Sequence, residues 1–213
     1  GEIGNNLYLE EVADLAEEVI LSTGMHSLSD VENSVNIINS KNKAKLTLLQ
    51  CTSSYPCPDS GVNLLAMKTL ETCFNCPVGF SDHTLGITAS IAAASIGASI
   101  IEKHFTKDKS LQGPDHKCSL EPEELSQLVE AIRSIPVIMG SPIKKVQSCE
   151  VDTKSIVSKV IVASKNISKG DILSYENMTS MRGESRGLSC SKIKDLFGRR
   201  SSYNFRKGEM IKV

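Results

Sequence analysis

The sequence predicts an α/β fold in which a parallel sheet is followed by a smaller α+β module. Short apolar runs alternate with helical stretches along the first part of the chain, which is typical of parallel sheets. Polar clusters stand where these runs end, and in α/β folds ligands bind at that edge of the sheet. The pattern changes after residue 140, so we divide the chain into a parallel-sheet domain (1–140), a linker (141–155) and a second domain (156–213).

Composition limits the class of protein. A chain of 213 residues can bury a core in one or two domains. The net charge of −1 gives no basic footprint for nucleic acid or an anionic membrane. The longest apolar stretch, residues 87–101, is too short and too polar to span a bilayer, and no signal peptide is visible. Seven irregularly spaced cysteines indicate reduced thiols and a cytoplasmic protein, and we interpret the Cys73–Cys76 CxxC as incidental.

The first domain is predicted to hold four strands, each followed by a helix, after an opening helix over residues 7–16. The predicted strands cover residues 19–21, 45–50, 77–80 and 99–103. The predicted helices after them cover residues 30–39, capped by Ser29, and 62–74, 88–96 and 121–134. Half of an eightfold barrel has this content. Since four strands cannot close a barrel, we expect the N-terminal half to lie outside this sequence, and the fragment alone to be poorly soluble.

The second domain is predicted to be a compact α+β module of about 60 residues, which is small for a domain. A strand is expected over residues 157–163 and a short helix over residues 191–197. Turn signals containing Lys-Gly stand at residues 167–171 and 206–209.

Five ordered motifs carry a resemblance to a known family. They are Ser-Thr-Gly-Met at 22–25, Cys-Thr-Ser-Ser-Tyr-Pro at 51–56, Ser-Asp-His-Thr-Leu-Gly at 81–86, Glu-Lys-His-Phe-Thr at 102–106, and Gly-Pro-Asp-His at 113–116 followed by Ser-Leu-Glu-Pro. With them the chain resembles the N-acetylneuraminate (sialic acid) synthase family over essentially its whole length, and its C-terminal module resembles that family's antifreeze-like (SAF, β-clip) domain.

The resemblance implies a (β/α)8 TIM barrel followed by the SAF domain, in a domain-exchanged homodimer. It implies condensation of phosphoenolpyruvate with an N-acyl mannosamine-type sugar, with Mn²⁺ or a similar divalent ion such as Mg²⁺ or Co²⁺. Aligned on its motifs, the chain starts near the fourth barrel strand.

Two histidines are the predicted metal ligands. His83 and His104 close neighbouring strands, so their imidazoles are expected to converge at one edge of the sheet. Two neutral imidazoles with water and substrate oxygens suit Mn²⁺, Co²⁺ or Zn²⁺, and such an ion would polarise the sugar aldehyde. The resemblance implies the same catalytic role. The alternative is that each is a hydrogen-bonded core histidine.

Glu102 is the third predicted catalytic residue. It precedes His104 by two positions on a strand, so both side chains face the same side, which is the interior of a closed barrel. An unpaired carboxylate is costly there, so it must meet a cation or handle protons. By resemblance it lies near C2 of phosphoenolpyruvate. The alternative is a salt bridge, although Lys103 points the opposite way.

Hydroxyl groups and one further carboxylate are the predicted substrate-binding groups. Ser22, Ser53, Tyr55 and Ser81 lie just past strand ends, where hydroxyls and backbone amides can hold phosphate. Ser22 and Ser81 match the family's phosphate-binding serines, Ser53 stands where many members have Asn, and Tyr55 matches a tyrosine that touches both substrates. Asp115 matches a residue that binds sugar hydroxyls. The alternatives are helix caps for the serines and a turn-forming role for Asp115.

In the second domain, Arg182 matches an arginine that reaches the partner's barrel and contacts the N-acyl group. Arg186 is the alternative reader, and a solvated basic loop is the alternative interpretation. His116 is expected behind the ligands, and His26 has no assigned role.

Three functional hypotheses follow. The favoured one is a metal-dependent N-acetylneuraminate synthase that uses phosphoenolpyruvate and N-acetylmannosamine and releases phosphate. The second is a legionaminic or pseudaminic acid synthase acting on a 2,4-diacetamido-trideoxyhexose. The third is an inactive fragment whose SAF module serves binding or oligomerisation.

Overall fold

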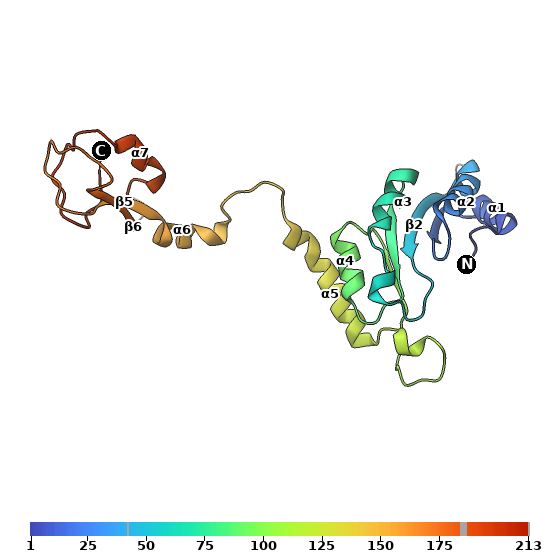
Figure 1. The fold of residues 1–213 in the computed structure, drawn as a ribbon. Helices are drawn as coiled ribbons and strands as arrows, with labels where there is room; N and C mark the ends of the chain where they lie inside the picture. The colour runs from blue at the N-terminus through green and yellow to red at the C-terminus, as the bar shows by residue number, and fades with distance from the viewer. Residues whose placement is uncertain (42, 184–186, 213) are drawn as a thin grey trace. The chain divides into compact units, whose positions relative to one another are not determined.

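The computed structural model describes residues 1–41, 43–183 and 187–212 (Figure 1). The chain forms two compact units, Gly1–Gly140 and Ser141–Val213, which are described separately. Within the described residues, no helix combines the length and the apolar character that crossing a membrane requires.

A parallel sheet of four strands organises the first unit, as predicted. The strands lie side by side in chain order: β1 (Glu18–Ser22), β2 (Lys45–Cys51), β3 (Val78–Asp82) and β4 (Ile101–Lys103). Each crossover contains a helix, which is what parallel pairing of successive strands requires. All four carboxyl ends therefore reach the same edge of the sheet, where the polar motifs stand.

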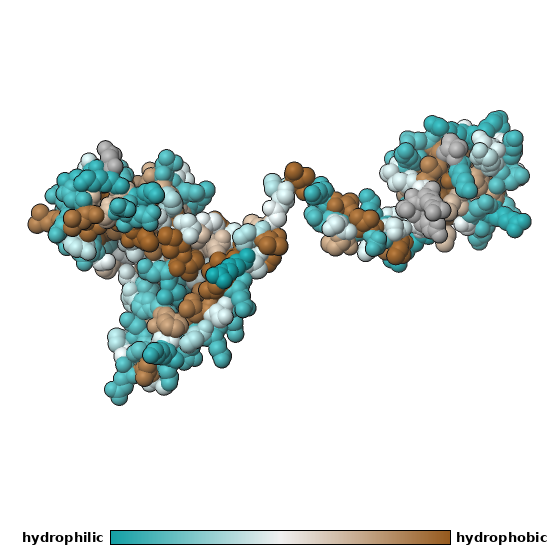
Figure 2. Space-filling model, turned by 180° about the vertical axis from the view of Figure 1, so that it is seen from behind, coloured by the Kyte–Doolittle hydropathy of each residue, from teal (hydrophilic) through white to brown (hydrophobic). Residues whose placement is uncertain are grey.

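Over the described residues of the first unit, five helices accompany the sheet. They are α1 (Asn6–Leu15), α2 (Leu28–Ser40), α3 (Ala66–Phe74), α4 (Thr88–Ser95) and α5 (Pro122–Met139), with 3-10 turns at Asp59–Gly61 and His116–Cys118. The core lies between helices and sheet, and alternate strand residues such as Leu48 and Phe80 enter it. The strand residues that alternate with these point to the opposite face of the sheet. On that face the side chain of Ile20, in β1, is 54% exposed. Figure 2 shows apolar patches on the surface of this unit.

Several helix boundaries differ from the predicted ones, and three of the differences have a clear local description. Ser27, not Ser29, caps α2, because its side chain and that of Asp30 form a reciprocal capping box. Helix α3 begins at Ala66 rather than at residue 62, since Asn63 has a φ of 50° and interrupts the helical path. Helix α5 continues past Ser134 to Met139 despite an internal proline.

The second unit is a small α+β body, as predicted. It contains α6 (Val151–Val157), β5 (Lys159–Ala163), β6 (Met178–Arg182) and α7 (Ile193–Leu196), with 3-10 turns at Ser148–Glu150 and Cys190–Lys192. Strands β5 and β6 pair antiparallel over a core that includes Ile161 and Phe205. Two features were not predicted: helical turns begin inside the expected linker, and β6 exists although four of its five residues are exposed and show no alternation.

Candidate active site

Three rings from three strand ends meet at the carboxyl edge of the sheet. The centroid of Tyr55 lies 4.1 Å from that of His83 and 5.7 Å from that of His104. The two histidine rings are 5.3 Å apart and perpendicular. Residues that stand far apart along the chain therefore share one small region, because β2, β3 and β4 are neighbours in the sheet.

The orientation of His83 is set by the loop after β2. Its Nδ1 lies 2.9 Å from the carbonyl oxygen of Thr52. A carbonyl oxygen only accepts, so Nδ1 donates to it, and in the neutral ring Nε2 then keeps its lone pair. The Cys51 sulfur lies 3.8 Å from the same Nδ1. His83 is only 7% exposed, so the surrounding side chains restrict the motion of its ring. An imidazole with this tautomer can bind a metal ion or accept a proton through Nε2.

Two side-chain interactions between register partners connect β3 to β4. Ser81 stands opposite Glu102 in the register, and its hydroxyl donates to Glu102 Oε1 at 2.6 Å. Ser81, predicted to bind phosphate, therefore also holds the predicted catalytic carboxylate. Asp82 stands opposite Lys103, whose Nζ lies 3.0 Å from Asp82 Oδ2, with side-chain exposures of 3% and 0%.

The Asp82 carboxylate is the centre of a buried network that sequence reasoning did not identify. It accepts hydrogen bonds from the backbone N and Oγ1 of Thr84, both at 2.8 Å, and from Ser90 Oγ at 2.5 Å. Lys103 Nζ also donates to the Thr84 carbonyl at 2.5 Å. These bonds fix the backbone on both sides of His83. Alternation along β4 places Lys103 on the face opposite to Glu102. A buried acidic partner for Lys103 on that face of the neighbouring strand, which is Asp82, could therefore have been predicted.

His104 faces the loop that carries Asp115. Its Nδ1 lies 3.8 Å from Asp115 Oδ2, and the two side chains are 34% and 48% exposed. The Cys118 thiol belongs to the same group, although the sequence motifs did not single it out. The sequence did offer one signal for it: Cys118 stands three residues after Asp115, a spacing that brings two side chains together in a short turn.

The Tyr55 hydroxyl experiences the negative groups of this edge. Its pKa is raised, first because burial disfavours the phenolate and then because of the charges of Cys51, Asp115, Glu102 and Cys118. The tyrosine is nevertheless 52% exposed, so it forms part of an open surface.

The remaining predicted residues lie at or near this edge, or in the second unit. Ser22 ends β1 and is partly buried. Ser53 packs against Gly24 in the loop after β1. A Cβ atom added to Gly24 would lie 2.3 Å from the Ser53 hydroxyl oxygen. Arg182 is the exposed last residue of β6, and Arg186 lies outside the described residues.

Two histidines lie outside the ring cluster. His116 Nδ1 is 2.7 Å from Thr106 Oγ1, a hydrogen bond behind the Asp115 loop. His26 Nδ1 donates to the Gly24 carbonyl at 2.6 Å.

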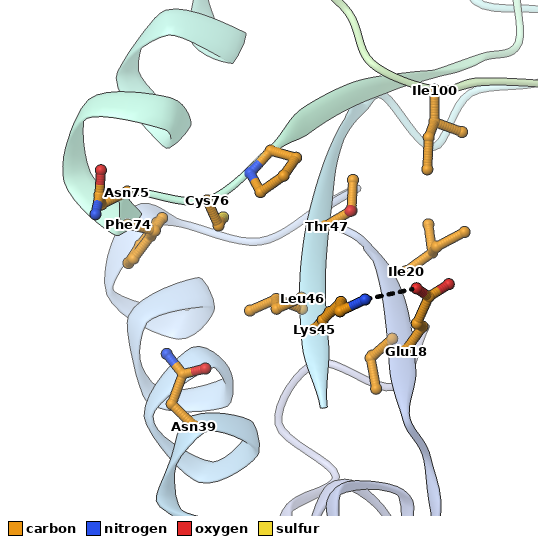
Figure 3. A pocket seen from close by; sticks show the side chains of 12 residues that line it. Glu18, Ile20, Asn39, Lys45, Leu46, Thr47, Phe74, Asn75, Cys76 and Ile100 are labelled. Atoms are coloured by element: carbon orange, nitrogen blue, oxygen red, sulfur yellow. Dashed lines mark ion pairs between the residues drawn. The ribbon is translucent and has the colours of Figure 1, made fainter. Parts of the chain in front are cut away.

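A pocket at the opposite, amino ends of the strands is shown in Figure 3. Its charged side chains are Glu18 and Lys45, which pair at 3.7 Å and are 73% and 85% exposed. It lacks the convergence of buried polar groups found at the carboxyl edge, so the candidate active site is placed at that edge.

A parallel βα sheet with imidazole, carboxylate and hydroxyl groups at its carboxyl edge is the arrangement of a barrel-type enzyme. The chain belongs to the NeuB family, whose model matches residues 1–144, and residues 158–212 match the SAF domain. The resemblance found in the sequence is thereby confirmed.

Individual relatives agree with this assignment. The chain is 44% identical to an N,N'-diacetyllegionaminic acid synthase of Campylobacter jejuni, over 100% of this chain and 64% of that protein. It is 35% identical to the human N-acetylneuraminate-9-phosphate synthase, over 94% of this chain and 56% of that protein. A solved N-acetylneuraminic acid synthetase from Leptospira borgpetersenii superimposes with a TM-score of 0.65 at 41% identity, over 71% of this chain and 53% of that one. The chain thus spans less than two thirds of the length of these relatives.

Proposed function

We propose that the full-length protein is a nonulosonic acid synthase. It condenses phosphoenolpyruvate with the open-chain aldehyde of an N-acylated amino sugar and releases phosphate. The convergence of His83, His104, Tyr55 and the Ser81–Glu102 pair at one sheet edge, in a NeuB family chain, carries this proposal.

The sugar is the finer part of the proposal. Relatives named for diacetyllegionaminic acid reach 44% and 40% identity, which favours a 2,4-diacetamido-trideoxyhexose as first candidate. N-acetylmannosamine, favoured from the motifs alone, is the second candidate, supported by the solved sialic acid synthetase at 41% identity.

The histidine pair fits a divalent ion, with Mn²⁺ as first choice and Mg²⁺ or Co²⁺ as alternatives. The fit rests on His83, whose Nδ1–H is engaged by Thr52 so that Nε2 is free to bind, with His104 beside it. An ion held by these two residues would supply Lewis-acid polarisation of the sugar aldehyde.

The other side chains act on the two substrates directly. C3 of phosphoenolpyruvate forms a bond to the aldehyde carbon, water adds at C2, and the resulting tetrahedral centre loses phosphate. In this proposal Glu102 holds the attacking water and takes its proton, and the hydrogen bond that it accepts from Ser81 supports this role. Ser22 and Ser53 bind phosphate, and Tyr55 touches both substrates.

Two further roles complete the proposal. Asp115 binds sugar hydroxyls. Arg182 reaches into the barrel of the partner subunit in a domain-exchanged homodimer and contacts the N-acyl group of the sugar. The protein acts in the cytoplasm. Each side chain has the chemistry that its role requires. A carboxylate accepts hydrogen bonds from sugar hydroxyls, and a guanidinium donates hydrogen bonds to an amide carbonyl.

The test is phosphate release from phosphoenolpyruvate by the full-length protein, with each sugar in turn, with Mn²⁺ or with EDTA. Release that requires sugar and metal, and that is lost in His83→Ala, is expected. The sugar with the higher kcat/KM identifies the product. Absence of release with every sugar would refute the proposal and favour the inactive-fragment hypothesis.

A further inference from the structure

Three side chains of metal-binding type meet beside the candidate active site. The ligand atoms of His104, Asp115 and Cys118 all lie within 4.8 Å of one another. The thiol is buried, with Cys118 only 6% exposed, whereas the side chains of His104 and Asp115 are 34% and 48% exposed. An ion can therefore enter from solvent and reach a sulfur that is itself protected.

The loop that carries the thiol is fixed to the strand end that carries the imidazole. The backbone N of Leu120 donates to the carbonyl of His104 at 2.8 Å, and the N of Thr106 donates to the carbonyl of Leu120 at 2.9 Å. These two bonds form a parallel bridge between Phe105 and Leu120. The distance between the imidazole and the loop is thus set by backbone hydrogen bonds.

The turn itself places the carboxylate and the thiol on one side. Residues His116–Cys118 form a 3-10 turn, and in that geometry side chains three positions apart are eclipsed. Asp115 and Cys118 have this spacing. The Asp115 carbonyl also accepts hydrogen bonds from the Cys118 thiol at 3.2 Å and from the Ser119 hydroxyl at 2.8 Å. The sulfur therefore lies against the backbone carbonyl of Asp115, within 4.8 Å of the carboxylate.

These distances suit a small tetrahedral ion. Metal–ligand bonds of about 2.0–2.3 Å place neighbouring ligand atoms roughly 3.5 Å apart. His104 Nδ1 and Asp115 Oδ2 are 3.8 Å apart, close to that value. Coordination by Cys118 requires its sulfur to leave the hydrogen bond with the Asp115 carbonyl, and the thiol proton passes to solvent when the sulfur binds.

We propose that His104, Asp115 and Cys118 form a site for a thiophilic divalent ion, Zn²⁺ above all. A mixed nitrogen, oxygen and sulfur donor set favours Zn²⁺ or Co²⁺ over Mn²⁺ and Mg²⁺, which prefer oxygen ligands. Three protein ligands leave a fourth position for water. This site uses a thiolate and does not include His83, but it shares His104 with the histidine pair and Asp115 with the proposed sugar contact. Because a neutral imidazole offers one lone pair, His104 binds only one of the two ions at a time, so an ion held by Cys118 competes with the ion of the histidine pair.

Cobalt reports directly on thiolate binding, so it is the probe. The full-length protein, fully reduced and free of metal, is titrated with Co²⁺ without either substrate, and the near-ultraviolet thiolate-to-cobalt charge-transfer band is recorded. We expect the band in the wild type and in His83→Ala, and its loss in Cys118→Ala and Cys118→Ser. Zn²⁺ should displace Co²⁺, and its affinity should fall at least tenfold in Cys118→Ser, since even outer ligand partners contribute about 10–100-fold.

A second thiol provides the matched control. Cys51 is also buried, and its sulfur lies 3.8 Å from Nδ1 of His83. Cys51→Ala should keep the band. The proposal is overturned if the band is absent from a folded wild type, if it survives in both Cys118 variants, or if it disappears with Cys51 or His83 instead. Circular dichroism checks that each variant is folded. Because the readout needs no turnover, it is independent of the proposed synthase activity.

Discussion

Replacement of Lys103 by methionine tests the buried network beneath the active-site loop. The change keeps an aliphatic stem but removes the cation 3.0 Å from Asp82 Oδ2, in a pair with side-chain exposures of 3% and 0%. Removing one partner of a buried pair typically costs about 3–5 kcal/mol, because a charge is left without compensation. Asp82 retains three hydrogen bonds from Thr84 and Ser90, so we expect about 3 kcal/mol.

The assay is thermal or urea unfolding of the full-length protein. A loss of about 3 kcal/mol corresponds to a fall in Tm of roughly 6–12 °C for a domain of about 150–250 residues. Lys45→Met is the matched control, since it breaks the exposed pair with Glu18, and exposed pairs contribute little to stability.

A double-mutant cycle separates the pair from other effects. Asp82→Asn combined with Lys103→Met removes both charges, so it should be more stable than the sum of the two single losses predicts. The reasoning is refuted if Lys103→Met costs less than about 1 kcal/mol, or if the two changes are simply additive.

Three further predictions concern the same sheet edge and the sheet itself. Ser81→Ala removes the 2.6 Å hydrogen bond to Glu102, so kcat for phosphate release should fall at least about tenfold with little change in Tm, and an unchanged kcat would separate the pair from catalysis. The pKa of Tyr55 is raised, so its phenol should keep its proton to higher pH than a free tyrosine does; the ultraviolet difference titration between wild type and Tyr55→Phe should therefore show a tyrosine step above the ordinary range, and a step within that range would contradict this assignment. Gly79→Ala should destabilise the protein by about 1–3 kcal/mol in urea unfolding, because the added Cβ would fall 2.4 Å from the carbonyl oxygen of Ile100. Gly61→Ala is its control, because there the Cβ would make an ordinary 3.5 Å contact; equal losses in the two variants would contradict the steric explanation.

Much of the fold followed from local pattern. Apolar runs and helical periodicity predicted all four strands of the first unit in their order, because a parallel sheet with helical crossovers leaves few other arrangements. The boundaries of α2 and α3 were wrong, since they depend on which serine forms the cap and on one residue with positive φ. Strand β6 was missed because its exposed residues show no alternation.

The sequence by itself determined the family, the half-barrel and the residue types at the carboxyl edge. Tertiary structure alone decided which of them touch: the register that places Ser81 opposite Glu102, the Lys103–Asp82 pair, and the approach of Cys118 to His104. The physical reason is that periodicity and motifs are set by neighbours along the chain. Register and side-chain contact depend instead on packing between segments that are distant in sequence.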